Sequence, residues 1–115
     1  MHETGIAMEV LRIASESLSG RAVHRVTALR LTVGRWSGVE PEALRFALEA
    51  ISAGSRFDGC RVEISVVEPR FRCDACGTEY AAEHHLEPCP SCGQTAGALV
   101  AGDEMTLDAI EVEEA

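Results

Sequence analysis

Four of the five cysteines form two matched pairs, each reading Cys-x-x-Cys-Gly. The pairs are Cys73 with Cys76 and Cys89 with Cys92. A spacing of two residues lets both thiolates of a pair reach one tetrahedral ion, and the following glycine permits the turn that aims backbone N–H groups at sulfur. Two such pairs predict a closed four-thiolate site for Zn²⁺. Because such a site has no open position for water, it is typical of a structural ion rather than a catalytic one.

Other interpretations concern the cysteine pairs themselves, two nearby histidines and the fifth cysteine. A thiol oxidoreductase would need one Cys-x-x-Cys pair at the start of a helix in a strand–helix unit, and two matched pairs argue against it. His84 and His85 precede the second pair and are either exposed loop residues, substitute ligands or groups that sense pH near the site. Cys60 shares the apolar side of an alternating segment, so we expect it to be a buried small hydrophobe.

The N-terminus offers a second set of metal ligands. The bulk of His2 should leave Met1 in place, so that the Met1 α-amine, the His2 backbone nitrogen and the imidazole Nδ1 can bind one ion in adjoining chelate rings. Nitrogen-rich, planar-leaning coordination suits Ni²⁺ and Cu²⁺. Glu3 can complete the sphere, and Glu40 is a further acidic candidate. The alternative is a frayed terminus without function, because chain ends are commonly disordered.

Length and charge exclude several classes of function. The chain has 115 residues, enough for one domain with a small appendage, and a net charge of −9. All ten basic residues are arginines, the last of them Arg72, and residues 73–115 hold ten acidic residues. This C-terminal third repels phosphate, which argues against nucleic-acid binding. No apolar stretch is long enough to cross a bilayer and the start lacks a secretory signal, so we expect a cytoplasmic protein without membrane contact.

The hydrophobic pattern predicts two amphipathic helices and three strands, whereas residues 73–103 show little periodicity. Thr4 is expected to cap the first helix, Pro41 to open the second, and Thr27 to share the core side of the first strand with Leu29. We expect a solvated tail over residues 111–115. The predicted helices span residues 4–19 and 41–54, and the predicted strands span residues 25–33, 60–66 and 105–112.

This order of elements indicates an α+β fold. Two helices on one face of a small sheet of about three strands would bury both apolar stripes. The cysteine segment would then be a zinc-ribbon domain inserted between two strands. It is too poor in hydrophobic residues to fold without its metal.

Several motifs taken together resemble the HypA/HybF family of nickel-insertion accessory proteins for [NiFe]-hydrogenase maturation. They are Met1-His2-Glu3 before a helix, Val33-Gly34-Arg35-Trp36-Ser37-Gly38-Val39 before Pro41-Glu42-Ala43-Leu44, the two cysteine pairs, and Gly102-Asp103-Glu104-Met105 before the last strand. The resemblance covers essentially the whole chain. Each motif is ordinary alone, and the combination is specific.

The resemblance implies a nickel metallochaperone and not an enzyme. It implies an αβ domain, residues 1–72 plus 104–115, that carries transient Ni²⁺ on Met1, His2 and Glu3, and a ribbon, residues 73–103, with structural Zn²⁺ on the four paired cysteines. The implied partners are an accessory GTPase of nickel delivery and the precursor of the hydrogenase large subunit. Some relatives also supply urease, and a homodimer is left open. The alternative is a zinc-ribbon adaptor that organises a protein complex without carrying nickel.

One departure from the family pattern is visible. Many members have an acidic residue after the glycine that ends the first strand, where this chain has Arg35 and Trp36. We interpret Trp36 either as a partner contact, since aromatics are enriched at interfaces, or as a lid on the helix packing.

Overall fold

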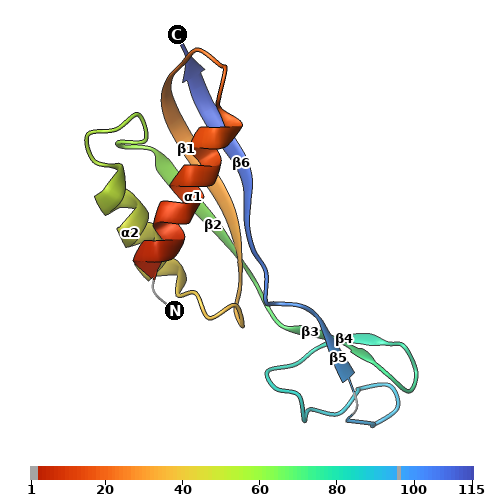
Figure 1. The fold of residues 1–115 in the computed structure, drawn as a ribbon. Coiled ribbons are helices and arrows are strands. Elements are labelled where there is room, and N and C mark those ends of the chain that lie inside the picture. The colour runs from red at the N-terminus through yellow and green to blue at the C-terminus, as the bar shows by residue number, and fades with distance from the viewer. Residues whose placement is uncertain (1–2, 96) are drawn as a thin grey trace.

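The chain folds into two parts of unequal size, each built on its own sheet (Figure 1). A computed structural model describes residues 3–95 and 97–115 and measures 57 × 24 × 17 Å along its principal axes. The elements are α1 (Glu3–Ser17), β1 (Val23–Gly34), α2 (Pro41–Ser52), β2 (Arg61–Val67), β3 (Arg70–Cys73), β4 (Glu79–Ala81), β5 (Gly97–Ala101) and β6 (Met105–Glu114). No helix in the described ranges is both long and apolar enough to span a bilayer.

The larger part is a three-stranded sheet with both helices on one face (Figure 1). The strand order is β2-β1-β6, with β1 parallel to β2 and antiparallel to β6. Leu29 at the centre of β1 lies opposite Val62 of β2 and Ile110 of β6. The predicted α+β arrangement of two helices on a small sheet is confirmed.

The core of this part follows the apolar stripes of the helices. Residues three or four apart on each helix face the sheet, where they meet alternate residues of β1. The buried members are Ala7, Val10, Ala14 and Leu18 with α1, Leu44, Ala47 and Leu48 on α2, and Leu29, Leu31 and Val33 on β1. Pro41 opens α2 as predicted, because its fixed φ suits the first helical position.

Two details of the sequence prediction are wrong. Helix α1 already includes Glu3, so Thr4 lies inside the helix and is not its cap. The β1–β6 pairing shifts between Val26 and Ala28, and this irregularity puts Val26 rather than Thr27 into the core. The tail expected to be solvated is exposed at Glu113, Glu114 and Ala115, and β6 continues its pairing with β1 as far as Glu114.

The smaller part is an antiparallel sheet of three short strands in the order β4-β3-β5. None of these strands was predicted, since three to five residues are too few to show a reliable alternation. Its small core holds Phe71, Tyr80 and Ala82 together with Cys73 and Cys89. So few buried side chains fit a unit whose folding energy comes largely from a metal.

Backbone contacts tie the loop after β1 to both connections between the two sheets. The amide of Gly34 donates to the Glu104 carbonyl at 2.7 Å, that of Arg35 to Val67 at 2.9 Å, and that of Trp36 to Gly102 at 2.6 Å. A Cβ on Gly34 would lie 2.2 Å from the carbonyl carbon of Gly102, so only glycine allows this close approach. The loop therefore anchors the smaller sheet to the larger one.

Trp36 strengthens this junction from the loop. Its ring lies 5.6 Å from Phe71, edge-on at 75°, and 5.1 Å from His85, measured between centroids. The indole packs against the core of the smaller sheet. The interpretation of Trp36 as a lid on the helix packing is therefore wrong, because its partners belong to the smaller sheet and its loop.

Candidate metal centres

The four paired cysteines converge at one end of the smaller sheet. Their sulfur atoms all lie within 4.8 Å of one another. The sulfurs of Cys73 and Cys92 are 3.5 Å apart, and those of Cys76 and Cys89 are 3.6 Å apart. Four sulfurs placed about 2.3 Å from a central zinc at tetrahedral angles would be separated by about 3.8 Å. The group therefore has nearly the dimensions of a four-thiolate zinc site before any ion is added.

The two cysteine pairs have the same backbone geometry. In the first pair the Cys73 amide donates to the Thr78 carbonyl and the Gly77 amide donates back to Cys73, both at 2.9 Å. In the second, Cys89 donates to Gln94 and Gly93 donates back to Cys89, both at 2.8 Å. The glycines adopt φ values of 78° and 79°, in the left-handed region that glycine reaches without strain. The repeated Cys-x-x-Cys-Gly spacing is thus a repeated turn.

Local hydrogen bonds set the ionisation of the thiols unequally. A hydrogen bond with the Thr78 hydroxyl, 3.2 Å away, is the main reason that the pKa of Cys76 is lowered to about 6. At Cys92 a backbone N–H from Gln94 favours the thiolate, but the neighbouring thiols outweigh it and raise the pKa to about 12. A bound divalent ion deprotonates its coordinating thiols, so it would bring all four to the thiolate form. This donor set fits structural zinc.

The structure keeps both histidines of the following loop out of this group. His84 is exposed, its Nδ1 accepts from the Leu86 amide at 3.2 Å, and its Nε2 lies 3.7 Å from Glu87. His85 packs against Trp36 and Phe71 instead. Among the described residues the four cysteines are the only group of metal-ligating side chains close enough to hold an ion. The contact of His85 with Trp36 was not predicted, because the two residues are distant in sequence.

The structure describes two of the four predicted nickel ligands. Met1 and His2 lie outside the described residues. Glu3 and Glu40, the two remaining candidates, lie together, because the Glu3 carboxylate accepts a hydrogen bond of 3.1 Å from the Glu40 amide. Figure 1 shows that α1 and α2 both begin at the end of the larger part that lies nearest the smaller sheet.

Glu40 also has a structural role that the sequence analysis missed. It is the N-cap of α2, and its carboxylate accepts a hydrogen bond of 2.7 Å from the Ala43 amide. Its position directly before the helix-opening Pro41 was the available signal. Glutamate is not among the preferred capping residues, so that signal was weak.

Known proteins resemble this chain in sequence over nearly its whole length. The model of the family described as "Hydrogenase/urease nickel incorporation, metallochaperone, hypA" matches residues 1–112. The hydrogenase maturation factor HypA of Geobacter sulfurreducens is 39% identical over 113 residues, which cover 98% of this chain and 100% of the relative. That of Roseiflexus sp. is 38% identical over 115 residues, covering 99% and 94%.

Two solved structures have the same fold. The solution structure of the nickel metallochaperone HypA from Helicobacter pylori has a TM-score of 0.66 at 17% identity and covers 100% of both chains. Another HypA solution structure has a TM-score of 0.72 at 17% identity, with 98% of this chain and 97% of the other covered. The family match and the close relatives identify this chain as a maturation factor and not an enzyme. It belongs to the HypA family of metallochaperones, which incorporate nickel during hydrogenase maturation.

Proposed function

We propose that this chain carries Ni²⁺ at its N-terminus, on Met1, His2 and Glu3, and hands it on during hydrogenase maturation. The observation that carries the proposal is the position of Glu3, which begins α1 and is fixed to the start of α2 through the Glu40 amide. Glu3 directly follows, in the sequence, the two residues that supply the proposed α-amine and imidazole ligands. Glu40 is the further candidate for the coordination sphere.

The chemistry of these donors suits transient carriage. Amine, amide and imidazole nitrogens favour Ni²⁺ in a planar-leaning geometry, and the usual affinity order makes Cu²⁺ bind such a set more tightly still. Selection of nickel would then depend on metal supply and on the partners. A site at a chain terminus also lets a receiving protein displace the ligands one at a time.

Zinc is proposed to act at a distance from the cargo, on Cys73, Cys76, Cys89 and Cys92. It would order residues 73–103 as the ribbon domain, with the nickel-carrying domain formed by residues 1–72 plus 104–115. The smaller sheet also includes Arg70–Cys73, so the ribbon's first strand begins just before this boundary. Because Trp36 rests on the ribbon core, the ribbon would hold a fixed direction relative to the nickel site.

The partners follow from the same role. We propose an accessory GTPase of nickel delivery and the precursor of the hydrogenase large subunit, both met in the cytoplasm. Urease would be a second recipient if the organism makes one. Nucleic acid is not an expected partner, because the last arginine is Arg72 and the ribbon is acidic.

The test of this proposal is a nickel titration of His2→Ala beside the unchanged protein, both loaded with zinc. Loss of the imidazole should weaken nickel binding by at least about a hundredfold, since it removes a ring of the chelate and a preferred ligand. Zinc content and far-UV circular dichroism should stay unchanged. His24→Ala, at an exposed histidine of β1, is the matched control and should bind nickel normally. Undiminished affinity in His2→Ala would favour a zinc-ribbon adaptor that carries no nickel at this position.

A further inference from the structure

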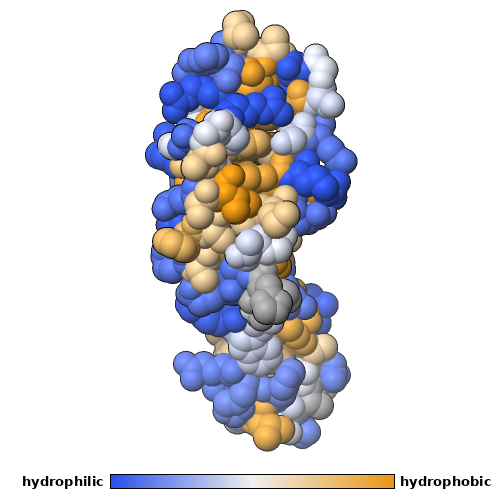
Figure 2. Space-filling model, turned by 60° about the vertical axis from the view of Figure 1, so that its left-hand side comes forward, coloured by the Kyte–Doolittle hydropathy of each residue, from blue (hydrophilic) through white to orange (hydrophobic). Residues whose placement is uncertain are grey.

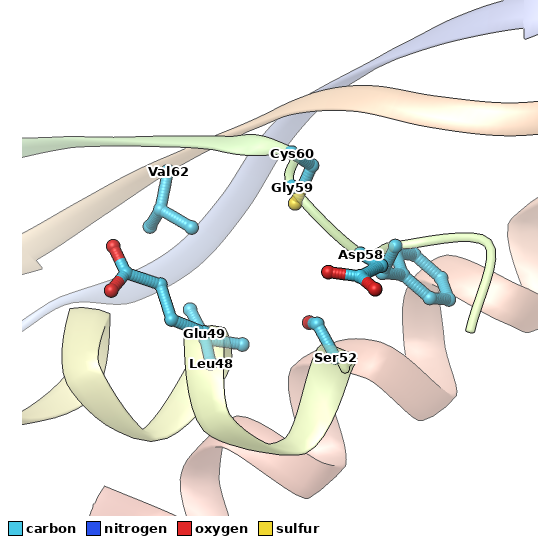
Figure 3. Close-up of a pocket in the computed structure, with 8 residues that line it drawn as sticks. Leu48, Glu49, Ser52, Asp58, Gly59, Cys60 and Val62 are labelled. Atoms are coloured by element: carbon cyan, nitrogen blue, oxygen red, sulfur yellow. The ribbon is translucent and has the colours of Figure 1, made fainter. Parts of the chain in front are cut away.

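A cavity of about 300 Å³ lies between the C-terminal half of α2 and the segment that leads into β2. Leu48, Phe57 and Val62 supply apolar walls, whereas the carboxylates, hydroxyl and thiol of Glu49, Ser52, Asp58 and Cys60 supply polar ones. Figure 3 shows the Glu49 and Asp58 carboxylates on opposite sides of the space, with Ser52 rising from the helix below and the Cys60 sulfur hanging from above. Its lining includes none of the four paired cysteines and neither Glu3 nor Glu40.

One polar atom in this cavity lacks a partner. Ser52 is 3% exposed, and its hydroxyl oxygen is fully buried without a hydrogen bond to any described residue. In Figure 3 the hydroxyl points toward the space beside Asp58 and Cys60. An unsatisfied buried hydroxyl costs folding free energy, so a ligand that bonds to it recovers that cost on binding.

The charges around the cavity favour a cation. Neither Glu49 nor Asp58 forms an ion pair within the described part of the chain, although Arg25, Arg45 and Arg56 lie in the neighbouring segments. The C-terminal end of a helix carries partial negative charge, and the last turn of α2 holds no basic residue to neutralise it. Arg45 instead donates to the Val62 carbonyl, and Arg56 lies over the Phe57 ring. Two carboxylates and a helix C-terminus thus face one small space, and no arginine is ion-paired with either carboxylate within the described residues.

The spacing of these groups argues for an organic cation rather than a metal ion. Glu49, Asp58 and Cys60 do not come close enough to form a metal-holding group, in contrast to the four ribbon cysteines among the described residues. Several N–H donors on one cation can reach separated acceptors, and an aliphatic stem can lie against Leu48 and Val62. Burial raises the pKa of the Cys60 thiol, so this side chain contributes a neutral, polarizable surface.

We propose that this cavity binds an ammonium or guanidinium group carried on a short aliphatic stem, held by the Glu49 and Asp58 carboxylates and the Ser52 hydroxyl. The stem and head group are those of a small alkylamine or alkylguanidine, and also of a lysine or arginine side chain of another protein. The proposal is independent of nickel binding.

The experiment is a titration of the zinc-loaded full-length protein with agmatine at low ionic strength, followed by amide chemical shifts. Agmatine should produce saturable shifts in residues 48–52 and 57–62. Glu49→Gln and Asp58→Asn should each weaken binding by about tenfold or more, and Ser52→Ala by about fivefold, in keeping with the loss of charged and neutral hydrogen bonds. The amide oxygen that Asp58→Asn introduces can still accept the hydrogen bond that the Asp58 carboxylate receives from the Gly54 amide, so the turn is preserved.

Controls separate the site from general charge attraction. Glu83→Gln removes one exposed carboxylate in the ribbon and should leave agmatine binding unchanged. The neutral analogue 1-pentanol should give no saturable shift. Nα-acetyl-arginine amide distinguishes the two sources: shifts from it as well as from agmatine show that the cavity accepts an arginine side chain, and shifts from agmatine alone assign it to a free cation. No saturable shift with either ligand, or equal weakening by Glu83→Gln and the cavity variants, would overturn the proposal.

Discussion

The Glu3 carboxylate accepts a hydrogen bond of 3.1 Å from the backbone amide of Glu40. This contact joins the beginning of α1 to the beginning of α2. Glu40 also ends the loop that follows Gly34. This loop holds Trp36 against the ribbon core. Glu3, one of the proposed nickel ligands, is thus connected through Glu40 and one short loop to the part that holds the zinc cysteines.

The Glu3 contact can be tested by two substitutions that differ in one property. Glu3→Ala removes the acceptor, whereas Glu3→Gln keeps an oxygen that can accept from the Glu40 amide. We expect Glu3→Ala to weaken nickel binding by about tenfold and Glu3→Gln to weaken it by less, because the helix start stays anchored. Calorimetry at equal zinc content checks this. Equal losses in the two variants would show that anchoring by Glu40 is irrelevant to the site.

The cap of α2 predicts a stability change that is separable from metal binding. Glu40→Ala should lower the free energy of unfolding by about 1 kcal/mol, because the Ala43 amide loses its acceptor. Glu40→Asn, which caps well, should restore most of it. Glu49→Ala, at an exposed position of the same helix, serves as control and should change stability by less than about 0.5 kcal/mol. Urea unfolding of the zinc-loaded variants measures all three, and an unaffected Glu40→Ala protein would contradict the capping role.

The ribbon is expected to depend on its metal. Cys73→Ser should abolish stoichiometric zinc binding and disorder residues 73–103, because the small core around Phe71 is too limited to fold alone. Cys60→Ser changes a thiol outside the cluster and should retain full zinc. Zinc content by elemental analysis, with limited proteolysis of both variants, distinguishes them. A Cys73→Ser protein with full zinc and native protease resistance would mean that the ligand set is wrong.

Trp36 should control the rigidity of the junction. Its replacement by alanine removes contacts with Phe71 and His85, and we expect a loss of about 1–2 kcal/mol from a half-buried aromatic cluster. NMR relaxation should then show the two sheets tumbling more independently. Phe46→Ala is the matched control, since Phe46 is 74% exposed on α2. Identical relaxation in the Trp36→Ala and unchanged proteins would locate the rigidity in the backbone hydrogen bonds alone.

The pH dependence of Cys60 follows from its partial burial, which is less than the full burial expected from the sequence. Desolvation raises its pKa above the ordinary thiol value, so the reactive thiolate should appear only at higher pH. With zinc protecting the other four cysteines, iodoacetamide should modify Cys60 slowly at pH 8, and the rate should still be rising above pH 9. Mass spectrometry of the zinc-loaded protein gives this profile. A rate that levels off at the same pH as that of an unfolded cysteine peptide would show that the thiol is not desolvated.

Local sequence patterns predicted the two helices and the strands of the larger sheet well. The spacing of Val10, Ala14 and Leu44 placed both helices on the sheet, because a helical period records which side is buried. The cysteine spacing likewise predicted the four-sulfur cluster, because each turn is encoded within six residues.

The features that escaped prediction depend on contacts between distant residues. The bulge that places Val26 in the core arises from pairing with β6, and the packing of Trp36 on Phe71 depends on how the two sheets meet. The Glu3–Glu40 hydrogen bond joins residues that are 37 positions apart. No local sequence pattern records contacts between distant residues. The strands β3 to β5 are also too short to show a recognisable alternation of apolar and polar residues.

The central claim is nickel binding at the N-terminus, and the most direct measurement is a calorimetric Ni²⁺ titration of the untagged protein beside one with a single extra alanine before Met1. The extension converts the chelating amine to an amide and moves the histidine to the third position, while the core and the zinc cysteines are untouched. Tight binding in the untagged chain alone is the predicted result. Equal affinity in both proteins, or no binding in either, would contradict the claim.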